Sequence, residues 1–279
     1  MLSRRQFLKG ALAVGAMGVI GDAVLYEPRH IIIEKKTMPI NDLPDAFEGF
    51  RICQITDVHH GQFVGLKFIE KFVNKSNILN PDLMVLTGDY VYNSNKYVVP
   101  AISALCNLKS PNGILAVLGN HDHYHGAELT KEVFNKYNAN VLSNSSRLIE
   151  IKGKAICIAG VDDLWEGKQD LKEAFKNIPA DVPRILLSHN PDYAEIMPKT
   201  ERVDLMLAGH THGGQIRMPF SIAPVTMSNY GQKYTGGLVK SADTHVYVSR
   251  GVGVVGIPVR FNCPPEITII TLTKAVQQV

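Results

Sequence analysis

The chain has 279 residues, 45% of them hydrophobic, so it is long enough to bury the core of one large domain. Its formal net charge of +3 arises within residues 1–36, and the rest of the chain carries 23 basic and 23 acidic side chains. This balance argues against a basic surface for phosphate backbones, so nucleic acid is not an expected partner.

Residues 1–23 read MLSRRQFLKGALAVGAMGVIGDA, a basic patch followed by small and apolar residues from Gly10 to Gly21. This run has the length of a signal-peptide core and is too short for an ordinary membrane span. The stretch around Arg4 and Arg5, SRRQFLK, matches the twin-arginine export signal. We therefore expect recognition by the twin-arginine export machinery and delivery to the periplasm or cell envelope. Cleavage near residue 23 and retention as a membrane or cell-wall anchor are both left open.

Residues 24–50 are predicted to form a linker and an edge strand, and residues 51–279 to form one domain. Short apolar runs of strand length recur along that domain, at 51–56, 82–88, 113–120, 155–160, 184–189 and 204–209. Segments with helical spacing lie between them, at 65–80, 96–108, 128–139 and 167–179, and two more strands are expected at 244–251 and 266–272. Continuous apolar runs are typical of strands buried on both faces. The pattern therefore predicts an α/β fold with central sheets covered by helices.

Polar side chains follow five of these runs, at the points where the strands end: Asp57 and His59; Asp89; Asn120, His121 and Asp122; His189; and His210 and His212. In open α/β sheets, ligands collect at the carboxyl ends of the strands. Carboxylate and imidazole ligands without thiolates suit Mn, Fe, Zn, Co or Mg, and these candidates outnumber what one ion needs. The sequence therefore predicts two divalent metal ions.

The five blocks, in this order, resemble the motifs of the calcineurin-like metallophosphoesterase superfamily. The resemblance implies a four-layer αββα sandwich that hydrolyses a phosphate ester by attack of a metal-bridging hydroxide at a dinuclear site. It also implies one role for each motif residue: Asp57, His59 and His212 would bind the first ion, Asn120, His189 and His210 the second, and Asp89 both.

Three residues are expected to contact the substrate: Asn120, His121 and Arg260. By the same resemblance, His121 is the histidine beside the substrate phosphate that binds no metal, and Asp122 is its orienting partner. An imidazolium at His121 would stabilise the phosphoryl oxygens or protonate the leaving group. Arg260 is chosen because a guanidinium suits an anionic group.

A closer likeness adds SRRQFLK, GVDDLW (160–165), SHNPD (188–192) and the tail at 249–268. Together these segments are similar to exported or membrane-anchored bacterial phosphodiesterases of this superfamily, which favours a diester substrate. One alternative is hydrolysis of a lipid-linked pyrophosphate, UDP-2,3-diacylglucosamine, which would need an apolar groove that the sequence does not show. Another is a cell-surface module that holds metal without catalysis. The pairing of the four cysteines is also left open.

Overall fold

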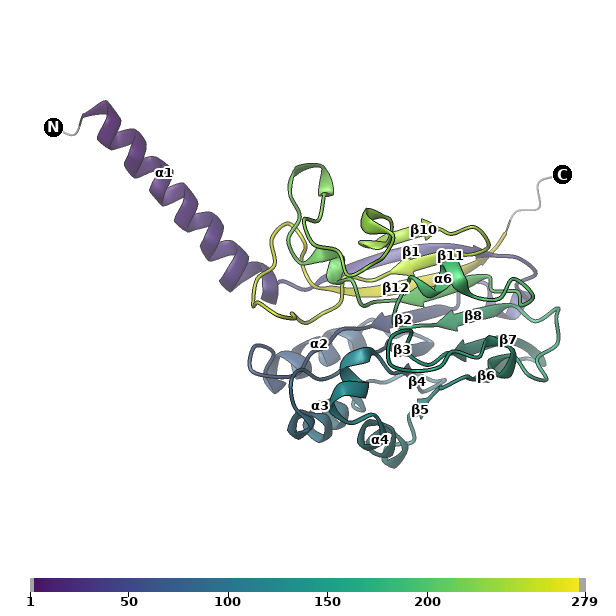
Figure 1. The fold of residues 1–279 in the computed structure, drawn as a ribbon. Coiled ribbons are helices and arrows are strands. Elements are labelled where there is room, and N and C mark those ends of the chain that lie inside the picture. Colours follow the sequence, from purple (N-terminus) through teal and green to yellow (C-terminus); the bar gives the residue numbers. More distant parts are fainter. Residues whose placement is uncertain (1–2, 276–279) are drawn as a thin grey trace.

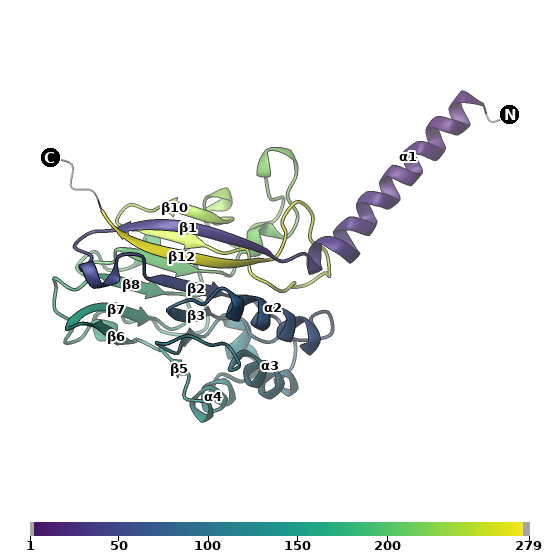
Figure 2. The ribbon, with the colours of Figure 1, turned by 180° about the vertical axis from the view of Figure 1, so that it is seen from behind.

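The computed structural model describes residues 3–275, which fold around two mixed six-stranded sheets (Figures 1 and 2). In order across the first sheet, the strands are β1 (Ile32–Ile40), β12 (Glu266–Lys274), β2 (Arg51–Ile55), β3 (Leu83–Thr87), β4 (Ile114–Val117) and β5 (Asn140–Val141). Strands β2 to β5 are parallel, and β12 is antiparallel to β2 but parallel to β1.

The second sheet also has a parallel centre with antiparallel edges. Its order is β10 (Gly237–Lys240), β11 (His245–Val248), β9 (Leu205–Ala208), β8 (Arg184–Leu187), β7 (Lys154–Gly160) and β6 (Ser145–Ile151). Strands β7, β8, β9 and β11 are parallel, and only β6 and β10 run against their neighbours. In both sheets the central parallel strands therefore deliver their carboxyl ends to one edge.

Helices cover the outer face of each sheet. The first sheet is covered by α2 (Leu66–Ile78), α3 (Val98–Leu105) and α4 (Asn120–Lys136), and the second by the short α5 (Leu171–Ala174) and α6 (Tyr193–Ile196). Further single turns of 3₁₀-helix lie at Glu27–Arg29, Asp45–Phe47, Asn95–Tyr97, His212–Gly214, Pro219–Ser221 and Gly231–Tyr234. This arrangement confirms the expected α/β fold of two mixed sheets between helices.

Three apolar clusters hold these layers together, and β3 shows how the sequence builds them. Leu83 and Val85 pack against the second sheet, whereas Met84 and Leu86 pack against the helices of the first. Because side chains alternate between the faces of a strand, a strand buried on both faces must be apolar at every position. The third cluster joins the second sheet to α5 and α6.

Several elements differ from the sequence-based expectation. Helix α4 begins at Asn120, eight residues before the predicted start, because its first turns carry the polar residues of the motif instead of an apolar stripe. The predicted helix at 167–179 is reduced to the single turn of α5. Strands β5, β6 and β10 were not predicted; β6 and β10 are half-exposed edge strands without a continuous apolar run.

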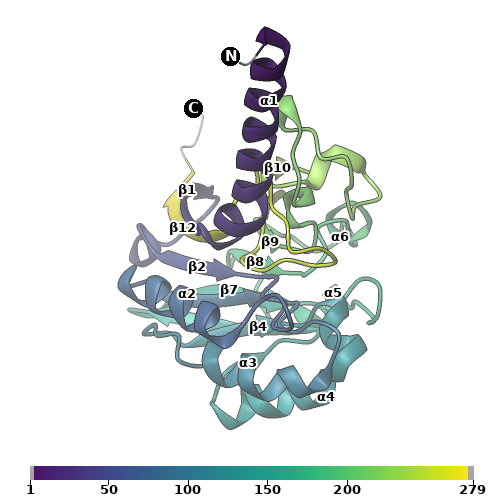
Figure 3. The same ribbon diagram turned by 90° about the vertical axis from the view of Figure 1, so that its left-hand side faces the viewer.

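Residues 4–29 form a continuous helical projection (Figures 1 and 3). Helix α1 (Arg4–Gly21) is capped by Ser3 and buries none of its side chains, and a π-helical turn (Asp22–Tyr26) continues it. The stretch Arg4–Arg29, with a mean hydropathy of 1.6, is long and apolar enough to cross a membrane, a test that signal sequences also pass. The helix continues past Gly21, beyond the apolar run from Gly10 to Gly21 that by itself is too short to span.

The segment expected as a linker and edge strand contributes directly to the first sheet. Strand β1 pairs in parallel with β12 along its whole length, from Ile32 opposite Glu266 to Ile40 opposite Lys274. It is the edge strand of that sheet, as predicted. The four cysteines are free, and Cys53, Cys157 and Cys263 are buried.

Candidate metal centre

The predicted ligands come together where the two sheets meet at the carboxyl ends of their parallel strands. Gln54 of β2 joins the sheets just below this point, because its side-chain amide donates to Thr87 Oγ1 on β3 and to the Ala208 carbonyl on β9. Above it, the backbone N–H of His210 donates to both carboxylate oxygens of Asp57, at 3.1 Å each. Two residues 153 positions apart in sequence are thereby held side by side.

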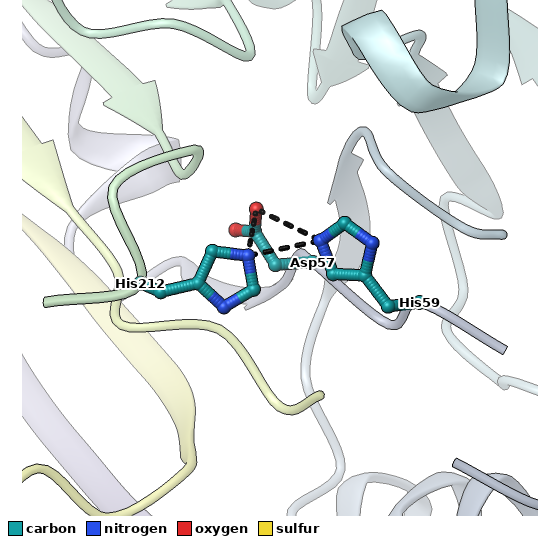
Figure 4. A group of neighbouring side chains, drawn as sticks. All are labelled: Asp57, His59 and His212. Carbon is teal, nitrogen blue, oxygen red and sulfur yellow. Dashed lines mark hydrogen bonds and ion pairs between the residues drawn. The ribbon is translucent and has the colours of Figure 1, made fainter. Parts of the chain in front are cut away.

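The first group of ligands comprises Asp57, His59 and His212 (Figure 4). The two Nε2 atoms of the histidines lie 2.9 Å apart, and Asp57 Oδ1 lies 3.3 Å from His212 Nε2 and 3.9 Å from His59 Nε2. All three side chains are buried. Three ligand atoms from two sheets therefore face one point.

The second group comprises Asp89, His189 and His210. Asp89 Oδ2 lies 3.2 Å from His189 Nε2, which in turn lies 3.2 Å from His210 Nδ1. The same carboxylate oxygen lies 3.4 Å from His59 Nε2 of the first group. Asp89 thus stands between the two groups, which is the position that a bridging ligand occupies.

Asn120 lies beside this second group, at the start of α4. Its amide oxygen is buried and has no hydrogen-bond partner among the described residues. A buried carbonyl oxygen without a donor is destabilising unless a ligand satisfies it. The imidazole nitrogens His59 Nδ1, His210 Nε2 and His212 Nδ1 are likewise buried and unpaired in this part of the chain.

The backbone of the ligands is unusual. Asp57, His59, Asp89, His210 and His212 all have φ between 48° and 70°, the left-handed region that residues with a side chain seldom adopt. Such strain costs about 1–3 kcal/mol per residue and persists where the surroundings enforce it. Here it turns each chain sharply at the end of its strand, so that successive ligands point into one pocket.

Two glycines permit the close approach of these turns. Gly88 has φ of 96°, and a Cβ there would lie 2.7 Å from His189 Nδ1. Gly251 has φ of 71°, and a Cβ there would lie 2.6 Å from Asp57 Cβ. Gly88 belongs to the predicted motif, whereas Gly251, in the loop after β11, was not singled out from the sequence.

Burial sets the protonation of the imidazoles. It lowers the pKa of His59 and of His210 to about 3 and that of His212 well below its usual value. These rings are therefore neutral at physiological pH, the form that binds metal. Burial also lowers the pKa of His189, but the Asp89 carboxylate outweighs it and holds that pKa well above the usual value.

Burial also raises the pKa of Asp57 to about 7, opposed by the positive charge of His189. A second contact fixes one ring: His189 Nδ1 lies 2.8 Å from the Thr87 carbonyl and donates to it, so a metal ion that displaced the Nε2 proton would bind the Nε2 lone pair. Imidazoles, carboxylates and an amide oxygen, with no thiolate, form a set that suits divalent ions such as Mn²⁺, Fe²⁺ and Zn²⁺. The residues present therefore fit a metal centre.

His121 forms a third group with His59 and Asp89, whose ligand atoms lie within 4.8 Å of one another, but Asp122 does not orient it. The His121 ring stands edge-on to His59 with centroids 4.8 Å apart, and its backbone N–H donates to Asp89 Oδ1. The Asp122 carboxylate instead accepts from the backbone N–H groups of Asp89, Tyr90 and Gly119. The expectation that Asp122 pairs with His121 was therefore wrong. Asp122, the third residue of α4, instead faces the backbone of the Asp89 loop and holds it in shape.

The expectation that Arg260 contacts the substrate was also wrong. Its side chain is 0% exposed, and its guanidinium donates to the carbonyls of Arg250, Gly251, Gly253 and Cys263. The guanidinium is buried among these four carbonyl groups and does not face a substrate. Arg260 instead fixes the 250–263 loop, including the glycine that packs on Asp57.

Trp165 ends the GVDDLW stretch (160–165), which begins at the last residue of β7. The indole stands edge-on to the His210 ring, with centroids 4.3 Å apart, and is 42% exposed. It therefore lies on the rim of the pocket. Asp163 supports this turn by accepting from the backbone N–H groups of Trp165 and Glu166.

Comparison with known proteins agrees with this geometry. Residues 50–214 match the family model of the calcineurin-like phosphoesterases. The chain belongs to this family. Residues 1–21 match the twin-arginine translocation signal, which implies the export machinery as a partner. The protein is thus a metal-dependent phosphoester hydrolase with a twin-arginine signal.

Curated relatives span almost the whole chain. An uncharacterized metallophosphoesterase of Bacillus subtilis, YkuE, is 37% identical over 97% of this chain and 98% of its own. The phosphodiesterase YaeI of Escherichia coli is 33% identical over 98% of this chain and 100% of its own. Among solved structures, the sulfate thiohydrolase SoxB of Thermus thermophilus is 12% identical, with a TM-score of 0.52 over 83% of this chain and 58% of its own. At that identity, the likeness concerns the fold alone.

Proposed function

We propose that this hydrolase cleaves phosphodiesters with two divalent ions. Asp57, His59 and His212 would hold the first ion, Asn120, His189 and His210 the second, and Asp89 both. The observation that carries the proposal is the position of Asp89 Oδ2, at 3.4 Å from His59 Nε2 and 3.2 Å from His189 Nε2. One oxygen within reach of both groups is the arrangement that two neighbouring cations require.

Two such ions neutralise phosphoryl charge and make bound water a nucleophile near neutral pH. In the hydrolysis, water supplies a hydroxyl group to phosphorus, the P–O bond to the leaving group breaks, and a proton passes to the leaving oxygen. His121 is placed to bind a phosphoryl oxygen or to deliver that proton, because its ring lies beside His59 at the pocket mouth. Asp122 keeps the Asp89 loop in position for this step.

A diester fits the charge of the pocket better than a monoester does. The groove that opens beside His121 and His212 is lined by 14 residues, none of them Lys, Arg, Asp or Glu. The guanidinium of Arg260, the nearby cation, already donates hydrogen bonds to backbone carbonyl groups. A monoester dianion has one more charge to neutralise than a diester monoanion, and the described lining offers no side chain for it. The similarity to the phosphodiesterase YaeI points the same way.

The twin-arginine signal supports an activity outside the cytoplasm, in the periplasm or cell envelope. We further propose that α1 stays on the protein as a membrane anchor. Its support is the exposed apolar helix, with no buried side chain between Arg4 and Gly21, and its continuation to Arg29.

Hydrolysis of bis-p-nitrophenyl phosphate and of p-nitrophenyl phosphate by metal-loaded protein tests the diester preference. The expected kcat/KM for the diester is at least about tenfold the value for the monoester, a difference of about 1.4 kcal/mol in transition-state binding. Both activities should disappear with a chelator and return with Mn²⁺. Equal or higher monoester activity would contradict the preference. Metal-loaded protein that hydrolyses neither ester would favour a binding module without catalysis.

A further inference from the structure

An apolar groove runs directly from the metal centre to the protein surface. Its volume is about 470 Å³, and His121 and His212 lie at its inner end. The walls farther out include Ile216, Val225 and Ile257. A groove of this size and lining accommodates a hydrocarbon better than a sugar or a nucleotide. It is also the feature that a lipid-linked substrate requires.

The outer rim of this groove exposes several large apolar side chains. Val225, Met227 and Ile257 of the groove lining are exposed, and so are Met218, Phe220 and Ile222 of the adjoining chain, with Phe220 94% exposed. Between residues 214 and 231 the only charged residue is Arg217, whose guanidinium donates to the Gly213 and Thr235 carbonyls. A clustered apolar rim on an exported protein indicates a contact surface. We call these six exposed residues the apolar rim.

The projecting helix and the apolar rim are on the same side of the molecule. The π-helical turn after α1 is fixed to the 257–263 loop, because Arg260 N–H donates to the Ala23 carbonyl and Asn262 N–H donates to the Glu27 carboxylate. That loop also carries Ile257 of the rim. Figures 1 and 3 show the light green 216–227 segment rising on the side from which α1 projects. A bilayer that contained α1 would therefore lie near the rim.

We propose that the groove binds the alkyl chain of an amphiphilic phosphodiester drawn from the bilayer in which α1 is anchored. The apolar rim rests on that bilayer, the chain lies against Ile216, Val225 and Ile257, and the ester phosphate reaches the metal centre beside His121. The absence of charge from the described groove lining lets a hydrocarbon enter without desolvating an ion. This inference rests on the proposed phosphodiesterase function and specifies its substrate class.

A series of alkyl p-nitrophenyl phosphates, each below its micelle concentration, tests the groove. With the full chain loaded with Mn²⁺, kcat/KM should rise by about fourfold per methylene buried, and by at least about thirtyfold from ethyl to octyl. The Val225→Ser, Ile257→Ser double variant should lose most of this octyl-to-ethyl ratio. Ile78→Ser is the control, because Ile78 is also an exposed apolar side chain but ends α2, which lies outside the groove lining.

A vesicle assay tests the rim. The dodecyl p-nitrophenyl phosphate is dissolved in phosphatidylcholine vesicles that carry the full chain. Its rate of hydrolysis is divided by the rate at which the same protein hydrolyses the monomeric octyl ester. Phe220→Ser should lower this quotient severalfold, and Ile78→Ser should leave it unchanged. An unchanged quotient in Phe220→Ser would overturn the membrane contact.

The outcomes separate the two proposals. A protein that hydrolyses the ethyl ester but shows no gain with chain length, or keeps its gain in the double variant, would overturn the alkyl groove and leave the phosphodiesterase standing. A metal-loaded protein that hydrolyses no diester of the series would overturn the phosphodiesterase itself.

Discussion

An Asp89→Asn protein is expected to lose both metal and turnover. Asp89 Oδ2 lies between His59 and His189, and an amide supplies only one neutral oxygen where a carboxylate supplies a charged one. The other carboxylate oxygen, Oδ1, accepts from the His121 N–H, a bond that an asparagine oxygen can still accept. The substitution therefore tests the bridging position more than the loop. We expect kcat/KM for a diester to fall by at least about a thousandfold, or about 4 kcal/mol.

Elemental analysis beside the activity assay measures both losses. Asp82→Asn is a matched control, because Asp82 accepts the Arg51 backbone N–H before β3, at the amino edge of the same sheet. The control should retain its metal and its activity. An Asp89→Asn protein that keeps two ions per chain and full turnover would contradict the assignment of Asp89.

His121→Ala is expected to give the opposite combination, with metal retained and turnover lost. No bond from the His121 ring holds any of the seven candidate ligands, and its Nδ1 is unpaired among the described residues. Removing a proton donor or phosphoryl contact of this kind lowers rates by about 10²–10⁴-fold. We expect kcat to fall within that range while the metal content stays at that of the unaltered protein.

His125→Ala is the control for this prediction. His125 lies one turn further along α4, with its ring 6.1 Å from that of His121, and belongs to none of the three groups that could hold a metal ion. It should keep both metal and turnover. If His121→Ala lost its metal, His121 would belong to the ligands; if it kept full turnover, His121 would have no part in the reaction.

The sequence predicted the framework because the physical signals were local. The continuous apolar runs at β2, β3, β4, β8 and β9 follow from burial on both faces, and polar residues directly after them mark the ligand edge. The half-exposed strands β6 and β10 carry no such run, so only the tertiary structure reveals them. The end of the N-terminal helix could not be predicted, because residues 22–29, which continue it, have no clear helical pattern in the sequence.

Within the site, the residue types were predictable but their contacts were not. Asp122 follows His121 directly, yet consecutive residues on a helix point in different directions. The Asp122 carboxylate therefore contacts the backbone after β3 instead of the His121 ring. Arg260 carries a charge that favours exposure, and only the folded loop supplies the four carbonyl groups that bury it. The left-handed backbone of five candidate ligands also has no clear sequence signal, because residues other than glycine seldom adopt it, although Asp and His do so more often than most.

The central claim is that seven side chains from both sheets hold two neighbouring ions. Anomalous X-ray diffraction from crystals of the Mn²⁺-loaded protein measures this directly. We predict two peaks about 3.5–4 Å apart, the usual separation in two-metal sites. One should lie among Asp57, His59 and His212, the other among Asn120, His189 and His210, with Asp89 touching both. A single peak, or two peaks without Asp89 between them, would contradict the account.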